Sequence, residues 1–275
     1  MTGRVWILTD RRYLKQRMPT ALADALRDRT GIEVRVVQTD GRVSEVGGLD
    51  GFTPQRGDVV VPRTRHPYAL WLLSRAELAG VASLSSSSAI AGVRDKPQAA
   101  LVLAAAGVPT PCTFVADTPT SLRSLPRSVF PLLLKPPLGD NAEGIIRVDE
   151  PDELERLGWP HGMVLAQCYV DVAGVDLKIY GAGDQLWAVR RRSPLLPAGG
   201  FDDAVPVPVD GRLRSIARAC QEAFGLAAFG LDVLPSPRGP LVVDVNDFPN
   251  YTGVAEATEV LAELVRSYLG VGVAA

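Results

Sequence analysis

The sequence holds few residues of the kinds that support cysteine or histidine chemistry. Its 275 residues include three cysteines, Cys112, Cys168 and Cys220, which are widely spaced and form neither a metal-binding pattern nor a disulfide framework. Such usage is typical of a reducing compartment, so we expect a cytoplasmic protein. The two histidines, His66 and His161, lie in no Cys/His cluster. Little is therefore available for a zinc site or a Ser-His-Asp triad.

Strong net charge and long apolar runs are also missing. The net charge is −2, which provides no global attraction to nucleic acid or to an anionic membrane. No apolar run approaches the roughly 18 residues of a membrane span. The segment VWIL near the N-terminus is followed at once by charged residues, unlike a signal peptide. We therefore expect a soluble protein with neither nucleic-acid nor membrane partners.

Lysine and asparagine are scarce enough to be informative. Of the 29 basic residues, 25 are arginines, and the four lysines are Lys15, Lys96, Lys135 and Lys178. A compact ammonium on a flexible stem suits a phosphate, so each lysine is a candidate for a specific role. Asparagine occurs three times, and two of its positions, Asn246 and Asn250, lie in one short stretch.

That stretch, residues 241–254 (LVVDVNDFPNYTGV), predicts a strand that breaks into a Pro/Gly loop. Side chains two apart on a strand share a face, so Asp244 and Asn246 should point one way while Val243 and Val245 face the core. Carboxylate and amide oxygens suit a hard cation such as Mg²⁺, which shares its ligands with phosphates. A strand end with an Asx turn before the proline is the alternative.

The N-terminal third alternates short apolar strands with helices, which predicts a parallel sheet with helices on its faces. We assign residues 1–92 to this unit and interpret its serine-rich end, residues 83–92, as an exit loop with a short turn. The expected strands are 4–8, 34–37, 58–62 and 81–84, and the expected helices are 18–31 and 67–80.

The rest of the chain favours hairpins with a few helices. A helix over residues 95–107 begins with Asp95 as N-cap and Pro97 in its first turn, and ends at Gly107. The proline-containing stretch 194–209 predicts an irregular loop. The other expected elements are a strand–loop–strand unit at 128–148, a short helix at 151–158, a strand at 163–170, hairpins at 176–192 and 227–246, and helices at 212–225 and 254–269.

Three lysines fall at positions suited to phosphates. Lys96 starts a helix, where backbone N–H groups and the helix dipole favour an anion. Lys135 ends the run LLLK before a loop that carries Gly139 and Gly144, whose backbone donors can close over phosphates. Lys178 shares a strand face with Asp176 and Tyr180.

Acidic and arginine residues complete the pattern. Residues 190–192 are three arginines on the return strand of the second hairpin, and Asp232 should face Asp244 across the last hairpin. Arg63 lies at the C-terminal end of a strand, where a parallel sheet usually meets its ligand. Together these parts indicate a site for a nucleoside triphosphate with Mg²⁺, although the sequence has no GxxxxGK[ST] motif.

The order and spacing of five segments resemble the ATP-grasp superfamily along nearly the whole chain. The segments are RDKPQAALVLAAAGVPTP, FPLLLKPPLGDNAEG, VLAQCYV, VDLKIYGAGDQLWAVRR and FGLDVLPSPRGPLVVDVN. The likeness is greatest to the RimK-like and glutathione-synthetase-like ligases and to the inositol 1,3,4-trisphosphate 5/6-kinases. It implies an α/β (α+β) ATP-grasp fold with a Rossmann-like N-terminal domain (1–92) and two α+β subdomains, 93–170 and 171–275, that clasp ATP.

The resemblance also implies roles by position. The residues that would bind ATP are Lys96, Lys135, Gly139, Gly144, Gln167, Tyr169, Val170, Asp171 and Lys178. Those that would hold one or two Mg²⁺ ions, or Mn²⁺, are Asp232, Asp244 and Asn246. The catalytic residues would be Lys178 and Arg191, with Arg190 a close competitor for the second position. Those expected to contact the substrates are Arg63, Arg190, Asn250 and Gly253.

The leading hypothesis is an ATP- and Mg²⁺-dependent ligase that joins a carboxylate to an amine through an acyl phosphate and releases ADP and phosphate. Its substrates would be small acids and amines of amino-acid or peptide-like kind. The alternative is a small-molecule kinase that phosphorylates a hydroxyl, and a non-catalytic nucleotide-binding module is the third. Two departures from the inositol-phosphate kinases argue against an inositol polyphosphate as the substrate of this protein. Residues 136–146 contain no histidine, and Asn250 stands where those kinases have glycine.

Overall fold

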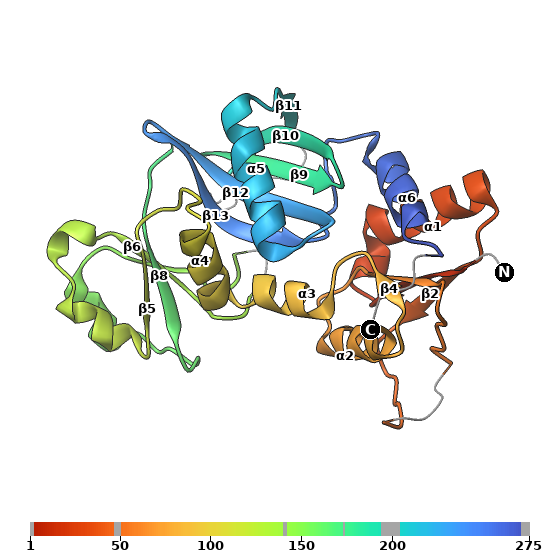
Figure 1. The fold of residues 1–275 in the computed structure, drawn as a ribbon. Coiled ribbons are helices and arrows are strands. Elements are labelled where there is room, and N and C mark those ends of the chain that lie inside the picture. Colours follow the sequence, from red (N-terminus) through yellow and green to blue (C-terminus); the bar gives the residue numbers. More distant parts are fainter. Residues whose placement is uncertain (1–2, 47–50, 140–141, 173, 194–203, 271–275) are drawn as a thin grey trace.

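The chain folds into three sheets joined by helices (Figure 1). A computed structural model describes residues 3–46, 51–139, 142–172, 174–193 and 204–270. The first sheet is wholly parallel and has the strand order β2-β1-β3-β4, as the alternation of strands and helices predicts. Its strands are β1 (Val5–Thr9), β2 (Val34–Gln38), β3 (Val59–Pro62) and β4 (Ala82–Ser83).

Local capping explains where the N-terminal helices start and stop. Helix α1 (Arg17–Thr30) ends at Gly31, which adopts the left-handed conformation with φ 63°. Helix α2 (Pro67–Leu78) begins at His66, whose ring Nδ1 accepts a hydrogen bond from the backbone N–H of Tyr68 at 3.2 Å. A single-turn 3-10 helix, η1 (Tyr13–Lys15), precedes α1.

The interpretation of residues 83–92 as a loop with a short turn is wrong, because they contribute to helix α3 (Ser87–Arg94). The hydroxyl of Ser86 accepts a hydrogen bond from the backbone N–H of Ala89 at 3.1 Å and caps the helix. Ile90 and Val93 are buried and anchor it. A cluster of serines resembles a loop in sequence, but one serine here is an N-cap.

The second sheet is antiparallel and has the order β5-β8-β6-β7. Helix α4 (Lys96–Ala105) leads into it and starts as predicted, with the Asp95 carboxylate accepting from Gln98 N at 3.0 Å. The expected short helix at 151–158 is a 3-10 helix. The remaining elements are β5 (Thr113–Ala116), η2 (Pro119–Ser124), η3 (Arg127–Val129), β6 (Leu132–Lys135), β7 (Ile146–Val148), η4 (Pro151–Arg156) and β8 (Val164–Cys168).

The third sheet is antiparallel with the order β11-β10-β9-β12-β13, and helix α5 (Gly211–Phe224) packs against it. Its strands are β9 (Val175–Ala182), β10 (Gln185–Arg192), β11 (Val205–Val207), β12 (Ala228–Ser236) and β13 (Gly239–Asp247). The short edge strand β11 corrects the expectation of an irregular loop at 194–209. Pro206 is tolerated there because an edge strand needs no donor on its outer side. Residues 194–203 lie outside the described part.

A β-bulge changes which valines of β13 face the core. Asp232 pairs with Asp244, but the next residue of β12, Val233, pairs with Val242, so Val243 is the extra residue. Val242 and Val245 are therefore buried, whereas Val243 is only half-buried. The prediction that Val243 and Val245 both face the core holds for Val245 alone, since a bulge breaks strict alternation.

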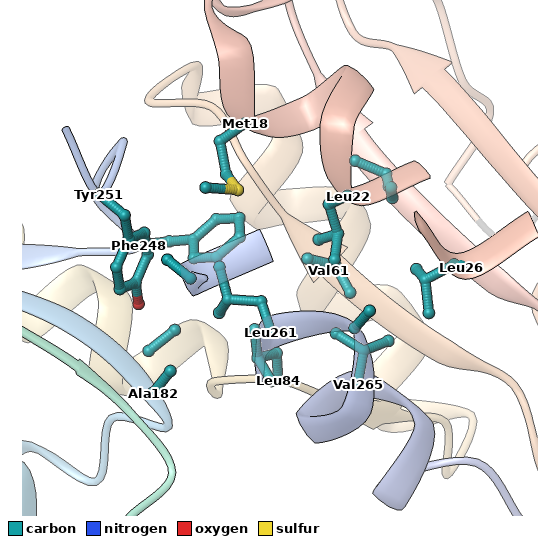
Figure 2. Close-up of a cluster of buried hydrophobic side chains, with 14 of the residues drawn as sticks. Met18, Leu22, Leu26, Val61, Leu84, Ala182, Phe248, Tyr251, Leu261 and Val265 are labelled. Atoms are coloured by element: carbon teal, nitrogen blue, oxygen red, sulfur yellow. The ribbon is translucent and has the colours of Figure 1, made fainter. Parts of the chain in front are cut away.

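The last helix, α6 (Ala257–Ser267), packs on α1, so the two ends of the chain share a hydrophobic core (Figures 1 and 2). Leu22 and Leu26 of α1 and Leu261 and Val265 of α6 are completely buried in this cluster. The contact holds the parallel sheet beside the third sheet. Among the described residues, no helix has the length and apolar character needed to cross a membrane.

Candidate active site

Asp232 on β12 is the centre of a charged cluster on one face of the third sheet. Lys178 Nζ lies 2.8 Å from each oxygen of the Asp232 carboxylate. Arg191 Nη2 lies 2.7 Å from Oδ1, and Asn246 Nδ2 donates to Oδ2 at 3.0 Å. Strand pairing explains the arrangement, because Lys178 pairs with Asp232 between β9 and β12, and alternation places Lys178 and Arg191 on the same side of their strands.

The electrostatics of Asp232 follow from this cluster. Burial alone would raise the pKa of its carboxyl group. The charges of Lys178 and Arg191, with hydrogen bonds from Lys178 and Asn246, outweigh burial and hold the pKa below its usual value. Asp232 is therefore ionised and neutralised by the two cationic side chains.

Asp176 shares the face of β9 that carries Lys178 and is buried. Burial, reinforced by the charge of Asp232, raises the pKa of its carboxyl group. Its Oδ1 atom has no hydrogen-bond partner among the described residues. The strand pattern of the sequence predicts Asp176 on this face but indicates no role for it.

Asp244 is held by a different lysine. Lys96 Nζ donates to its two carboxylate oxygens at 3.1 and 3.3 Å. The backbone N–H of Lys96 donates to Pro137 O at 2.9 Å, which fastens the start of α4 to the segment after β6. Lys96 therefore joins the strand that carries Asp244 to the base of the glycine-bearing loop.

Lys135 is buried between the second and third sheets. Its Nζ donates to Gln167 Oε1 at 2.7 Å and to the backbone oxygen of Val243 at 3.2 Å. That oxygen belongs to the bulge residue of β13, so the bulge supplies a partner for the ammonium. Burial lowers the pKa of Lys135 to about 8, because nearby Asp244 only partly offsets the loss of solvation.

The described part of the glycine loop includes Gly139 and Gly144. Gly144 has φ 73°, and a Cβ atom there would lie 2.8 Å from Pro136 Cγ, so both its conformation and its surroundings require glycine. Residues 140–141, which include Asn141, lie outside the described part. The carbonyl of Gly139 accepts a hydrogen bond from Arg65 Nη1 at 3.3 Å.

Arg63 and Arg65 extend from the C-terminal end of β3 toward the third sheet. Arg63 Nη2 donates to Asn250 Oδ1 at 2.6 Å and to Gln16 Oε1 at 2.8 Å. Its guanidinium lies over the ring of Tyr13, with a distance of 4.4 Å to the ring centre. Arg65 Nη2 donates to Asn246 Oδ1 at 2.9 Å.

These side chains line a cavity of about 400 Å³ between the parallel sheet and the third sheet. Its basic residues are Arg63, Arg65, Lys178 and Arg191. Its acidic residue is Asp247, which forms a buried ion pair with Arg94 at 2.7 Å. The remaining lining residues are Tyr13, Gln16, Thr64, Tyr180, Asn246, Phe248, Pro249, Asn250 and Thr252. The cavity is thus strongly cationic.

The loop after β13 forms one wall of the cavity in a strained conformation. Phe248 and Tyr251 both have φ 52°, which non-glycine residues rarely adopt. Tyr251 is completely buried and donates a hydrogen bond to Gly181 O at 2.7 Å, which holds the loop in place. Asn250 lines the cavity, whereas Gly253 lines a separate cavity of about 320 Å³ beside β10 and β11.

Four of the residues expected to bind ATP, residues 167 and 169–171, lie at and just after the end of β8. Gln167 is buried against Lys135, and the N–H of Tyr169 donates to Pro131 O at 2.9 Å. Arg147 lies over the Tyr169 ring, 4.4 Å from its centre. Val170 is half-buried and Asp171 is exposed. These residues therefore border the second sheet.

Neighbouring arginines of strand β10 point to opposite faces of the sheet. Arg191 reaches Asp232, whereas Arg190 lies on the opposite side of the strand and is exposed. The structure therefore does not bring Arg190 to the Asp232 cluster. Arg65 and Arg94 bind Asn246 and Asp247 from distant parts of the chain, and neither is among the site residues predicted from the sequence. No local sequence pattern distinguishes them from the other arginines.

The side-chain oxygens of Asp232, Asp244 and Asn246 suit a hard cation. Asp232 and Asp244 are cross-strand partners, and Asn246 lies two residues beyond Asp244 on the same strand, so two carboxylates and an amide oxygen gather at one place. Among the described residues, no group of three His, Cys, Asp or Glu side chains could hold a metal. Magnesium commonly takes one or two carboxylates together with substrate phosphates. The neighbouring lysines provide partners for such phosphates.

Comparison with known proteins gives consistent results. A family model described as RimK-like ATP-grasp domain matches residues 93–267. A protein of Shewanella amazonensis named probable alpha-L-glutamate ligase 2 is 29% identical over an alignment of 245 positions, and the match covers 82% of this chain and 81% of that protein.

Two solved structures share the fold. The crystal structure of the D-cycloserine synthetase DcsG has a TM-score of 0.78 and 21% identity, and the match covers 97% of this chain and all of that one. The ATP-grasp ligase PsnB in complex with a minimal precursor, Mg and ADP has a TM-score of 0.72 and 20% identity over 98% of this chain and 99% of that one. At these identities the likeness establishes the ATP-grasp fold.

Proposed function

The chain belongs to the RimK-like ATP-grasp family and is an ATP-dependent ligase that joins a carboxylate to an amine, and from this premise we propose its class of substrates. The acid substrate carries a second anionic group, as a glutamate or aspartate residue does, and the amine is that of an amino acid or peptide. The name of the Shewanella relative and the precursor bound to PsnB support amino-acid and peptide chemistry.

The cationic cavity carries this proposal. Four basic side chains line a space of about 400 Å³, which suits an amino-acid-sized group rather than a whole peptide. Its acidic residue, Asp247, is already paired with Arg94. One carboxylate of the substrate would lie beside Lys178 and Arg191, and a second anionic group would lie near Arg63. The four basic side chains outnumber the nearby carboxylate that they share, Asp232, so the cavity should attract an anionic substrate more strongly than a neutral one.

We further propose where the nucleotide binds. ATP lies between the second and third sheets, clasped by the units 93–170 and 171–275, with its phosphates near Lys96 and Lys135 and under the glycine loop. Asp232, Asp244 and Asn246 would hold one or two Mg²⁺ ions. When bound, ATP supplies the phosphoryl group that activates the carboxylate, and the metal offsets phosphate charge.

The protein contributes position and charge rather than a nucleophile. Lys178 and Arg191 hold the substrate carboxylate and the negative charge that develops as phosphate is transferred. Arg63 and Asn250 fix the far end of the acid substrate, and the strained loop after β13 holds the cavity wall. Such positioning accelerates the reaction because the reacting groups meet in a productive geometry. The kinase alternative is not favoured, since the relative and the two structural neighbours described above are ligases or synthetases.

Hydroxylamine trapping tests the proposal. The protein is incubated with ATP, Mg²⁺ and hydroxylamine, and with glutamate, aspartate, or short peptides that end in glutamate. Glutamine and alanine serve as matched acids without a second carboxylate. We expect ADP and a hydroxamate with the dicarboxylic acids, because hydroxylamine captures the activated carboxylate. The Lys178→Met variant should give neither product.

Two results would contradict the proposal. Equal rates with glutamine and glutamate would show that the cationic cavity does not select a second anionic group. Formation of ADP with a stable phosphorylated alcohol, and no hydroxamate, would support the kinase instead.

A further inference from the structure

Each oxygen that we assign to the metal is held by a basic side chain in this structure. Lys96 contacts Asp244, and Lys178 and Arg191 contact Asp232. The amide oxygen of Asn246 accepts a hydrogen bond from Arg65 at 2.9 Å. The site is therefore neutralised by the protein itself, and a metal ion has to displace or share these contacts.

Arg65 differs from the other three basic residues in its origin. It lies between β3 and α2, in the parallel-sheet unit, and its partner Asn246 is 181 residues further along the chain. Its other guanidinium nitrogen donates to Gly139 O at 3.3 Å. One side chain thus links the parallel sheet, the glycine loop and the proposed metal ligand.

We propose that Arg65 is a positioning residue that occupies the amide oxygen of Asn246 until Mg²⁺ binds with the nucleotide, and that it then exchanges this oxygen for the phosphates. The inference rests on the proposed assignment of Asn246 as a metal ligand. An amide oxygen that accepts a bond from a guanidinium is a poor ligand for a cation, because the positive charge beside it repels the ion. Phosphate oxygens give the guanidinium a stronger, charged partner.

The exchange predicts that metal and nucleotide assist each other in binding. Nucleotide phosphates draw Arg65 away from Asn246, which opens the oxygen to the metal. By thermodynamic linkage, the metal then strengthens nucleotide binding by the same factor. The contact with Gly139 would change in the same step, so the glycine loop would respond to occupation of the metal site.

Binding of Mn²⁺, followed by electron paramagnetic resonance with and without ADP, tests the exchange without catalysis. In the Arg65→Met variant we expect Mn²⁺ without ADP to bind at least about tenfold more tightly than in the unaltered protein, because the competing charge is gone. The enhancement of Mn²⁺ affinity by ADP should shrink correspondingly. Arg65→Lys keeps the positive charge but cannot reach both partners. Its Mn²⁺ affinity without ADP should therefore lie between those of the unaltered protein and Arg65→Met.

Arg17→Met is the matched control. Arg17 also reaches from the parallel-sheet unit to the C-terminal part, donating to Ala255 O and Thr258 Oγ1 at 3.3 Å, without contacting Asn246. Its loss should leave both Mn²⁺ affinities unchanged. Circular dichroism and thermal unfolding verify that the variants remain folded.

The outcomes separate this inference from the proposed function. If folded Arg65→Met binds Mn²⁺ without ADP no more tightly than the unaltered protein, the exchange is wrong, and the ligase proposal stands. If Asn246→Ala leaves Mn²⁺ affinity unchanged in the presence of ADP, the metal assignment itself is wrong and the inference falls with it. A hydroxamate in the trapping experiment is independent of both results.

Discussion

Asp232 and Asp244 stand directly opposite each other across the β12–β13 hairpin, yet different parts of the protein neutralise them. Lys178 and Arg191, from the same sheet, bind Asp232, whereas Lys96 reaches Asp244 from the start of α4. Two adjacent carboxylates repel each other. Because each has its own cationic partners, this repulsion is offset and the two carboxylates can lie side by side. The relationship leads to predictions about the site and the fold around it.

Replacing Lys178 by methionine should reduce kcat/KM at least about 100-fold, because Lys178 contacts both oxygens of Asp232 and borders the cationic cavity. The free energy of unfolding should fall by about 1–3 kcal/mol, since Asp232 keeps Arg191 but loses a buried charged partner. Steady-state kinetics and urea unfolding measure the two effects. Lys15→Met alters an exposed lysine and should change neither.

Lys135 should make stability depend on pH in the alkaline range. Burial lowers its pKa from 10.5 to about 8, so the folded state penalises its charged form. This penalty lowers the stability of the folded state by about 3 kcal/mol and is fully present below pH 8. It disappears as the pH rises toward 10.5, because the lysine of the unfolded chain then also loses its proton. The stability of the unaltered protein relative to Lys135→Met should therefore rise between pH 8 and 10.5.

Urea unfolding of both proteins at pH 7, 9 and 10 measures this difference. Other groups with raised pKa values, such as Cys220 and Tyr180, lower stability as the pH rises, but they are present in both proteins and cancel in the comparison. A difference that is constant with pH would contradict a shifted Lys135 pKa.

Gly230 should be intolerant of alanine. A Cβ atom at this position would lie 3.1 Å from Pro249 Cγ and 3.3 Å from Lys178 Cε, so either the lysine or the loop wall has to shift. We expect kcat to fall about tenfold, because a small displacement of a positioning group is costly, with a stability loss of about 1 kcal/mol. Gly211→Ala is the control, since a Cβ there meets nothing within 4 Å. Equal activity of the two variants would show that Lys178 tolerates displacement.

Cys112 and Cys168 should form a disulfide on mild oxidation. They extend the β5–β8 register as opposite residues, and the backbone N–H of Cys168 donates to Cys112 O at 2.8 Å. Opposite residues of this kind have Cα atoms about 5.5 Å apart, which a disulfide can span. A low-molecular-weight disulfide should exchange first with exposed Cys112, and attack by Cys168 should then complete the bond, releasing two small thiols.

Peptide mass spectrometry after oxidation identifies the bond. Cys220 is buried and should remain a thiol. In Cys112→Ser no intramolecular bond should form. A stable mixed disulfide at Cys112, without closure onto Cys168, would be inconsistent with the register at the end of β8.

The sequence by itself determined the features that depend on short-range patterns. Alternating strands and helices predicted the parallel sheet, and the hairpin over residues 227–246 placed Asp232 opposite Asp244, as the strand register confirms. The segments resembling the ATP-grasp superfamily predicted the fold and the ligase activity. Such features follow from side-chain periodicity, turn residues and capping, which act over a few residues.

Only the tertiary structure decided which distant residues meet. The contacts of Arg65 with Asn246 and of Arg63 with Asn250 join positions 181 and 187 residues apart. The proximity of Cys112 and Cys168 depends on how β5 pairs with β8, which their spacing in the sequence does not reveal. The bulge at Val243 redirected a valine that simple alternation places in the core. These outcomes arise from packing the sheets against one another, because that packing selects a few long-range contacts among many that local patterns leave equally possible.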